Sequence, residues 1–435
     1  MKIAYIAAGA AGMYCGSCIH DNTLATAMQQ LGAEVILVPT YTPLRTDETD
    51  VSINRVFYGG INVYLQQKAA LFRHTPNAFD RLLDRPRLLN LLSRFSSSTS
   101  AQDLGALTVS VLQGEAGRQQ KELAKLCQWL KDKFRPDLVH LTNSMFVGFA
   151  RQLKDTLNVP VLCAVQGEDL FLEGLIEPYK TQALALLKER ARDVDGFIAP
   201  CRYYAQFMGR YLDQPDEKMH VIRLGLNLVG HGADIVDQPD KPFTLGYLAR
   251  VCPEKGFHIF AEACHLIAQE LGHDHVRFQS AGYLSLKDEP FLAAQLDRLK
   301  AWGLEDIFDY RGELERQEKI AFLQELDLMS VPTVYHESKG LSILEALANG
   351  VPVVLPDHGA FPEWIEETGG GVLVEPQSPQ ALAQAILHLQ ANPDQRQTLG
   401  RQGKTAAHQK FNAESVARRS LEVFSRYAAA GQTAS

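Results

Sequence analysis

The sequence has 435 residues, of which 46% are hydrophobic and 22% are charged, and its formal net charge is −8. A single hydrophobic core rarely grows beyond about 250–300 residues, so the length predicts two domains. The acidic balance excludes a general nucleic-acid binder, which would carry a basic face.

The first eight residues form a short apolar run that leads into a glycine loop containing Gly9 and Gly12. We interpret the run as a buried first strand, because a secretory signal would begin with a basic region. No apolar run reaches the roughly 20 residues that cross a bilayer. Seven cysteines in a chain without such a signal indicate free thiols in a reducing compartment, so we expect a cytoplasmic protein.

Strand-like apolar runs alternate with amphipathic helical stretches along the chain. In the first half the runs are 3–8, 35–39, 138–141, 159–165, 197–200 and 220–223, and in the second half they are 243–249, 276–281, 328–332, 351–355 and 371–374. Continuous Val, Ile and Leu strands between helices are typical of parallel sheets covered on both faces. The pattern predicts an α/β fold with two doubly wound, Rossmann-like domains.

The joint between the two halves is a stretch rich in Gly, Asp and Pro at 226–242, which has no periodicity and indicates a linker. We therefore expect an N-terminal domain at 1–226 and a C-terminal domain at 227–412. Residues 413–430 predict a last amphipathic helix, and the sequence leaves open whether it packs back on the first domain.

Residues 59–114 fit the alternating pattern poorly and indicate an insertion. Within 81–94, arginines alternate with leucines, and the basic positions are Arg81, Arg85, Arg87 and Arg94. One interpretation is a solvated helical insertion. The other is a lid or a basic amphipathic helix that lies on anionic lipid, giving peripheral membrane contact.

Cys15 and Cys18 form a C-x-x-C motif in the loop after the first strand. They can be two partly buried thiols, or a redox pair, since a helix N-terminus stabilises thiolates. A zinc site would need two further ligands, and only His20 and Asp21 are near in sequence. The Asp-x-Asp at 193–195 is explained by a helix end and a turn, so we predict no metal.

Polar side chains lie at the ends of two further strand-like runs. His140 lies in the run 138–141, and Glu168 and Asp169 follow the run 159–165. Because the carboxyl ends of parallel strands meet at one edge of a sheet, these residues are candidates for binding an acceptor or moving a proton. The alternatives are a structural histidine and helix-capping carboxylates.

Arg250 and Lys255 follow the first strand of the second half. Arginine suits bidentate contact with a phosphate, and lysine acts as a point charge, so the pair can carry the charge of a diphosphate. The alternative is a surface arginine and lysine on an ordinary loop.

Glu337 follows a later strand of the second half, and its loop enters a helix near Gly340, Leu341 and Ser342. Backbone N–H groups and the positive end of the helix dipole suit a phosphate there. Glu345 lies one turn into the helix. The spacing of Ser342 and Glu345 also fits a capping box, which requires no ligand.

Glu337 and Glu345 are separated by seven residues, and their segment resembles the E-x7-E signature of retaining GT-B glycosyltransferases, particularly family 4. Three further segments resemble motifs of that family in the same order along the chain, and these are 245–256, 310–314 and 358–363. The sequence departs from the family at Ser338-Lys339, where the family has Gly-Phe, and at Thr142 and Gln166, where it has histidines.

The resemblance implies a GT-B fold, with two Rossmann-like domains facing across a cleft. It implies that Glu337 lies by the donor sugar and that Glu345 binds the nucleotide ribose. It places the loop with Gly312 and Leu314 beside the nucleotide base.

The resemblance further implies that Gly12 and Gly16 face the donor diphosphate and the acceptor. Arg250 and Lys255 then stabilise the departing diphosphate, and His140 and Asp169 belong to the catalytic residues on the acceptor side.

The expected reaction moves a hexose-type sugar from a nucleotide diphosphate-sugar to an acceptor hydroxyl with retention. The nucleotide-sugar is a substrate, no cofactor is expected, and the acceptor is a sugar, a lipid-linked sugar or a small metabolite. A nucleotide-sugar epimerase or phosphorylase on the same fold is the alternative. Less favoured are a thiol or metal module at Cys15 and Cys18, and a dehydrogenase, since Gly9 and Gly12 lack the full dinucleotide motif.

Overall fold

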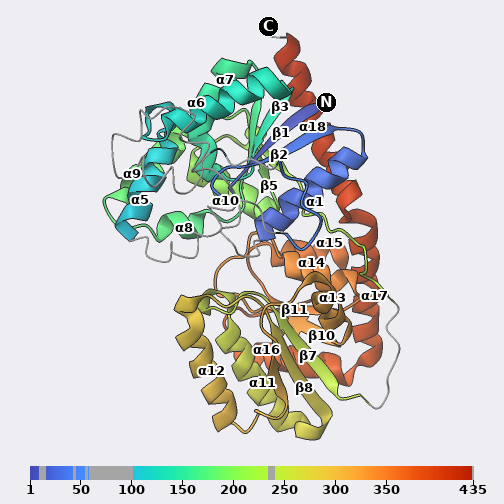
Figure 1. Ribbon diagram of the computed structural model, residues 1–435. Coiled ribbons are helices and arrows are strands. Elements are labelled where there is room, and N and C mark those ends of the chain that lie inside the picture. Colours follow the sequence, from blue (N-terminus) through green and yellow to red (C-terminus); the bar gives the residue numbers. More distant parts are fainter. Residues whose placement is uncertain (9–15, 43–45, 54–56, 58–100, 234–240, 434–435) are drawn as a thin grey trace. The chain divides into compact units, whose positions relative to one another are not determined.

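The computed structural model describes residues 1–8, 16–42, 46–53, 57, 101–233 and 241–433 (Figure 1). Gly12, Cys15 and the stretch 81–94 lie outside the described residues, as does most of the expected insertion. The chain divides into two compact units. The first contains Met1–Gly225 and Ala413–Ser435, and the second contains Leu226–Asn412.

The first unit contains a parallel sheet with the strand order β2-β1-β3-β4-β5-β6. Its strands are β1 (Lys2–Ala7), β2 (Glu34–Pro39), β3 (Leu138–Leu141), β4 (Val161–Ala164), β5 (Gly196–Ala199) and β6 (Met219–Val221). The long helices are α1 (Gly16–Gln30), α5 (Ala101–Leu112), α6 (Gln120–Trp129), α7 (Ala150–Leu157), α9 (Tyr179–Ala191), α10 (Arg202–Leu212) and α18 (Ala413–Thr433). Shorter helical segments are η2 (Gly114–Ala116), η3 (Leu130–Phe134), η4 (Ser144–Phe149), α8 (Asp169–Glu173) and η5 (Asp216–Lys218).

The second unit contains another parallel sheet, with the order β12-β11-β10-β7-β8-β9. Its strands are β7 (Phe243–Leu248), β8 (Val276–Ala281), β9 (Phe308–Tyr310), β10 (Leu328–Ser330), β11 (Val353–Pro356) and β12 (Gly371–Val374). The α-helices are α11 (Phe257–Leu271), α12 (Glu289–Ala301), α13 (Arg316–Gln324), α14 (Leu341–Ala348), α15 (Phe361–Thr368), α16 (Pro379–Ala391) and α17 (Pro393–Lys410), and the 3-10 turns are η6 (Pro253–Lys255), η7 (His273–His275) and η8 (Leu286–Asp288).

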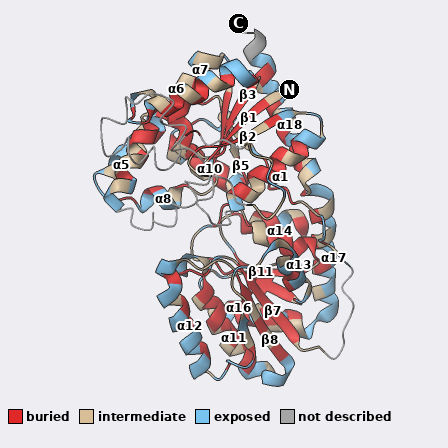
Figure 2. Ribbon diagram, in the orientation of Figure 1, coloured by how far each residue is buried: buried red, intermediate tan, exposed pale blue. Residues whose placement is uncertain are grey.

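These two sheets confirm the predicted fold class of two doubly wound α/β halves. Figure 2 shows that their central strands are buried, which explains why the strands are continuous apolar runs in the sequence. In each sheet, the strands that directly follow the first strand in sequence are added on one side of it, and the later strands are added on its other side. The restart lies between β1 and β3 in the first unit and between β7 and β10 in the second. Open α/β sheets bind ligands beyond the carboxyl ends of the strands at such a point.

The C-terminal helix α18 belongs to the first unit, which resolves the placement that the sequence left open. It packs against α1, as Figure 1 shows. Its Phe424 is buried in the core of this unit with Tyr5, at a ring-centroid distance of 6.3 Å, and with His140, at 5.3 Å.

The two ends of the second unit lie side by side. The amide of Leu226 donates to the carbonyl of Phe411 over 2.9 Å, and Leu226 and Asn412 form an isolated parallel bridge. The beginning of the expected linker is bound to the second unit, since Arg316 donates to the carbonyls of Asn227 and Val229.

The packing of Phe424 predicts that α18 stabilises the first unit. Replacing Phe424 with Ala removes a buried ring between Tyr5 and His140 and should destabilise the protein by about 3–5 kcal/mol. Urea unfolding followed by circular dichroism measures this loss. Glu422, an exposed residue on the same helix, is the matched control, and Glu422→Ala should change stability by less than about 0.5 kcal/mol. A loss below about 1 kcal/mol in Phe424→Ala contradicts the proposed contribution of α18.

Candidate functional site

The loops after β7 and β10 lie next to each other at the switch point of the second sheet, because these two strands are hydrogen-bonded neighbours. The amide of Val334 donates to the carbonyl of Glu254 over 2.9 Å. Gly256 has φ 72°, and a Cβ at this position would lie 1.7 Å from the carbonyl oxygen of Pro332. Only glycine allows this close approach, so the backbone itself joins the two loops.

The hydroxyl group of a buried tyrosine holds the loop that follows β7. The hydroxyl of Tyr247 lies 3.0 Å from the carbonyl oxygen of Arg250 and 3.3 Å from that of Lys255. Tyr247 itself is fully buried in β7. The positions of the predicted phosphate-binding residues are therefore fixed by the core, although Arg250 itself is exposed.

Lys255, Tyr335 and Glu337 form a closed triangle of side chains. The Lys255 Nζ lies 2.5 Å from Glu337 Oε2 and 2.6 Å from the Tyr335 hydroxyl, and that hydroxyl lies 2.6 Å from the same Glu337 oxygen. The second carboxylate oxygen, Oε1, accepts from the backbone amide of Lys339 over 3.1 Å. Both Lys255 and Glu337 are largely withdrawn from solvent, with 17% and 8% of their side chains exposed.

The surroundings of Glu337 keep it ionised. Burial is the largest single influence on this carboxyl group and raises its pKa, but the charge of Lys255 and the hydrogen bonds to Glu337 together outweigh burial. These hydrogen bonds come from Lys255, Tyr335 and the Lys339 amide, and the pKa of Glu337 falls from 4.5 to about 2. Glu337 is therefore a fixed anion at neutral pH.

The turn at His358 and Gly359 holds Glu337 from the other side. The amide of Ala360 donates to the Glu337 carbonyl over 2.8 Å, and the His358 Nε2 lies 3.0 Å from the carbonyl of Thr333. A Cβ on Gly359 would lie 2.6 Å from the Glu337 carbonyl oxygen. The segment 358–363, one of those that resemble motifs of the family, thus lies directly against the backbone of Glu337.

Helix α14 begins one residue before Ser342, and its N-cap is Gly340, at φ 78°. No side chain caps the helix, so the capping-box alternative for Ser342 and Glu345 is wrong. The reason is the left-handed conformation of Gly340, which starts the helix early and is held by Trp364, whose Nε1 donates to the Lys339 carbonyl over 2.7 Å. The first turn of α14 therefore presents amides without a side-chain cap, as phosphate binding requires.

Glu345 takes part in a buried ion pair that the sequence did not predict. Its Oε1 lies 2.6 Å from the Nζ of Lys319 on α13, and the exposed fractions of the two side chains are 6% and 12%. Helix α13 follows the loop with Gly312 and Leu314, and Gly312 adopts φ 70°. The ion pair thus joins the helix that carries Glu345 to the helix that follows the loop assigned to the base.

Of the two cations predicted to bind the diphosphate, Lys255 forms an ion pair with Glu337. Arg250 forms no ion pair with the residues that the structure describes. Its side chain is exposed at the end of the loop supported by Tyr247. Arg250 can therefore bind an incoming anion without first breaking an ion pair.

In the first unit, His140 points into the core rather than toward a loop. Its ring packs 4.4 Å from that of Tyr5, and burial lowers its pKa to about 3, helped by the nearby charge of His20. It is therefore neutral at physiological pH, and its placement favours the structural alternative over the catalytic one.

The two carboxylates after β4 have different surroundings. Glu168 is buried, and its two oxygens accept from the amides of Ser144 and Gln166, so it ties the ends of β3 and β4 together. Asp169 is partly exposed and accepts from the hydroxyl of Tyr204 over 2.6 Å. Asp169 is therefore partly accessible from solvent, as its predicted role in binding an acceptor requires.

The remaining predicted residue of this unit is Gly16, which is exposed at the first position of α1. Thr142 and Gln166 stand where the family has histidines. They are in contact, because the Gln166 side chain donates to the Thr142 carbonyl over 2.7 Å.

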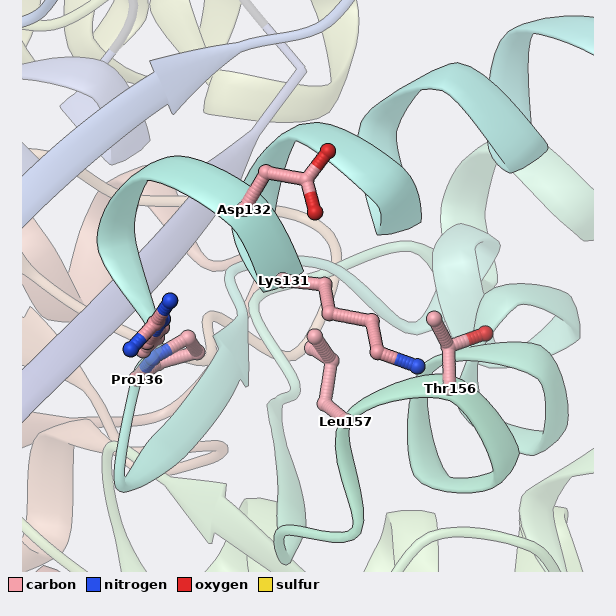
Figure 3. Close-up of a pocket in the computed structure, with 6 residues that line it drawn as sticks. Lys131, Asp132, Pro136, Thr156 and Leu157 are labelled. Atoms are coloured by element: carbon pink, nitrogen blue, oxygen red, sulfur yellow. The ribbon is translucent and has the colours of Figure 1, made fainter.

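A cavity of about 410 Å³ in the first unit lies elsewhere (Figure 3). It is lined by residues that precede β3 and β4, namely Lys131, Asp132, Arg135, Pro136, Thr156 and Leu157. This is the amino-terminal edge of those strands, the opposite of the edge where α/β sheets bind ligands, so the cavity is a weak candidate for the active site.

Within the described ranges, no cluster of three or more His, Cys, Asp or Glu side chains could hold a metal ion. Cys18 is buried and forms no disulfide, and its motif partner Cys15 lies outside the described part. No helix in the described part of the chain is long and apolar enough to cross a bilayer.

Comparisons with known proteins support the family resemblance and the fold. Residues 242–392 match the family model described as glycosyl transferases group 1, and residues 22–225 match the glycosyl transferase 4-like domain. An amylovoran biosynthesis glycosyltransferase of Erwinia amylovora is 28% identical over 220 residues, 49% of this chain and 52% of the relative. The D-rhamnosyltransferase of Pseudomonas aeruginosa is 25% identical over 286 residues, 64% of this chain and 67% of the relative. The chain spans about half the length of several curated relatives that it matches.

Solved structures show the same fold over almost the whole chain. Sucrose-phosphate synthase from Thermosynechococcus elongatus has a TM-score of 0.71 at 18% identity and covers 99% of both chains. Anabaena HepE, solved in complex with UDP, has a TM-score of 0.68 at 17% identity and covers 98% of this chain and 100% of its own. At such identities the likeness concerns the fold.

The lowered pKa of Glu337 predicts a pH-dependent stabilisation. An anion whose pKa is lowered by folding stabilises the folded chain above its ordinary pKa and loses this effect as the pH falls toward about 2. Wild type should therefore be more stable than Glu337→Gln by up to about 3 kcal/mol at pH 7, and the difference should shrink by more than half by pH 3.

Urea midpoints measured from pH 7 to pH 3 check this expectation. The matched control is Glu375→Gln, which changes an exposed carboxylate of the same unit and should have little effect at any pH. A stability difference for Glu337→Gln that stays constant over this range contradicts the buried ion pair.

Proposed function

Since this chain belongs to the group 1 glycosyl transferases, we propose that it transfers a sugar from a nucleotide diphosphate-sugar to an acceptor hydroxyl. We further propose that the transferred sugar keeps its anomeric configuration. The observation that carries this proposal is the convergence, at one switch point, of Lys255, Glu337 and the uncapped start of α14.

The leaving group of such a reaction is a nucleoside diphosphate, whose negative charge grows as the glycosidic bond breaks. Groups arranged in advance around that charge lower the barrier more than groups that must first reorganise. The first turn of α14 supplies backbone amides, and Arg250 supplies an exposed guanidinium. Lys255 supplies a charge whose position is fixed by Tyr335 and Glu337.

Glu337 is better suited to holding the sugar than to attacking it. Its Oε2 already accepts from Lys255 and Tyr335, and its Oε1 accepts from the Lys339 amide. A carboxylate stabilised in this way is a weak nucleophile and a weak base, but the remaining lone pair on Oε1 can accept a hydrogen bond from a sugar hydroxyl.

The proton of the acceptor then goes to the departing diphosphate. The acceptor oxygen forms the new bond to the anomeric carbon, the bond from that carbon to the phosphate oxygen breaks, and the phosphate oxygen takes the acceptor proton. Asp169 can orient the acceptor hydroxyl, because it is the partly exposed carboxylate at the carboxyl edge of the first sheet.

The nucleotide is held through its ribose by Glu345, whose position is fixed by Lys319. Support for a uridine nucleotide comes from Anabaena HepE, which shares the fold and was solved with UDP and with UDP-glucose. The acceptor, a cytoplasmic location and contact with a membrane through 81–94 stay predictions.

The main alternative is an epimerase or phosphorylase on the same fold. Such an enzyme converts or cleaves its nucleotide-sugar without an alcohol acceptor, whereas a transferase requires one. Measuring donor consumption with and without a panel of sugar acceptors separates the two.

Donor binding gives a direct test of the site. Thermal shifts with UDP-, GDP- and ADP-sugars should reveal one stabilising ligand, and Arg250→Ala should bind it about 10- to 100-fold more weakly, because a charged hydrogen bond to phosphate is lost. Glu345→Gln should also weaken binding; it is preferable to Ala because it keeps a hydrogen-bond acceptor for Lys319. The control is Arg401→Ala, which changes an exposed arginine of the same unit and should bind like wild type. Equal binding by Arg250→Ala and wild type contradicts the diphosphate site.

The configuration of the product tests the stereochemical part of the proposal. Proton NMR of the first-formed product should show the same anomeric configuration as the donor, because the leaving phosphate directs the acceptor to the face that it leaves. An inverted product rules out retention but leaves sugar transfer intact.

A further inference from the structure

Tyr335 is the third member of the triangle, and neither the E-x7-E signature nor the phosphate-binding pattern includes it. Its hydroxyl lies 2.6 Å from Lys255 Nζ and 2.6 Å from Glu337 Oε2. The Lys255 Nζ also lies 5.0 Å from the centroid of the Tyr335 ring. Lys255 therefore contacts Tyr335 through its hydroxyl.

The direction of each hydrogen bond follows from the groups involved. An ammonium group can only donate, and an ionised carboxylate can only accept. The phenol of Tyr335 must therefore accept from Lys255 and donate to Glu337. Burial, together with the charge of Glu337, raises the pKa of Tyr335 well above its ordinary value, so the phenol keeps the proton that this arrangement needs.

The loops do not depend on this phenol for their own structure. The Val334 amide already joins the second loop to Glu254, and Gly256 packs directly against Pro332. The first loop is held by Tyr247. The Tyr335 hydroxyl therefore orders side chains on a backbone that other contacts have already fixed.

We propose that Tyr335 is a positioning residue that holds Lys255 and Glu337 in their working geometry for the proposed sugar transfer. The ammonium group of Lys255 has three N–H bonds, of which Tyr335 and Glu337 take two, leaving the third for a phosphate oxygen of the donor. Without the phenol, the long side chain of Lys255 is free to rotate about the single contact with Glu337, and the third N–H loses its fixed direction. The effect of Tyr335 on catalysis rests on the proposed function, whereas the arrangement of the three side chains does not.

The substitution Tyr335→Phe tests the proposal because it removes the hydroxyl and keeps the aromatic ring. With the donor and acceptor identified as above, we expect kcat to fall at least about tenfold while the donor KM changes less than about threefold, since the contact matters most as charge develops on the diphosphate. The matched control is Tyr211→Phe, which removes another phenol–carboxylate bond, from Tyr211 to Glu173 over 3.0 Å in the first unit. Its kcat should stay at the wild-type value.

A second measurement does not depend on sugar transfer. NMR titration of carbon-13-labelled glutamate carboxyls, with the Glu337 signal assigned from Glu337→Gln, should show a midpoint near 2 in wild type. In Tyr335→Phe the midpoint should move upward toward 4.5, because one hydrogen bond to the ionised form is lost.

The two measurements separate the possible failures. If no nucleotide-sugar is turned over by wild type, the proposed function fails, and the titration alone still decides whether Tyr335 positions Glu337. An unchanged kcat together with an unchanged Glu337 midpoint in Tyr335→Phe overturns the inference. A lower melting temperature with neither of these changes shows that the phenol is only structural, and this also overturns it.

Discussion

The buried charge of Glu337 is the constraint on which the second unit's site depends. An ionised carboxylate in the interior is strongly unfavourable unless an opposite charge and hydrogen-bond donors surround it. Lys255 provides the charge, and Tyr335 and the Lys339 amide provide further donors. Each of these partners lies on a loop whose backbone is held independently, by Gly256 against Pro332 and by Gly359 against Glu337 itself. Two positive-φ glycines and one ion pair thus keep a charged cluster in place before any ligand arrives.

Much of this site could be predicted from the sequence because it follows from strand order. Arg250, Lys255 and Glu337 each follow an apolar strand-like run, and such runs in a doubly wound sheet end at the same edge. The motif order added the nucleotide-binding interpretation of Glu345. The helix was expected to begin near Gly340, Leu341 and Ser342, and it begins at Leu341. The capping-box alternative was wrong because the spacing of Ser342 and Glu345 imitates a cap, whereas the left-handed conformation of Gly340 leaves no periodic signal.

The side-chain partners could not be predicted in the same way. Lys255 meets Tyr335 across 80 positions of sequence, and Lys319 meets Glu345 across two different helices. Pairs of this kind depend on tertiary packing and leave no local pattern. For His140 the residue type suggested chemistry, whereas its neighbours Tyr5 and Phe424 surround it with rings that sequence order does not bring together. In the same unit, Glu168 and Asp169 are adjacent and indistinguishable by type, yet one joins two strand ends and the other remains partly exposed.

The adjacency of Leu226 and Asn412 has a consequence for how such a protein can change over evolutionary time. Since α18 returns to the first unit, the second unit is inserted between two parts of the first, and its entry and exit points are neighbours. A segment with adjoining ends can be replaced by a related cassette through recombination without disturbing the host fold around it. A chimera that exchanges the second unit for a related one therefore needs only two crossovers, both where Leu226 and Asn412 meet.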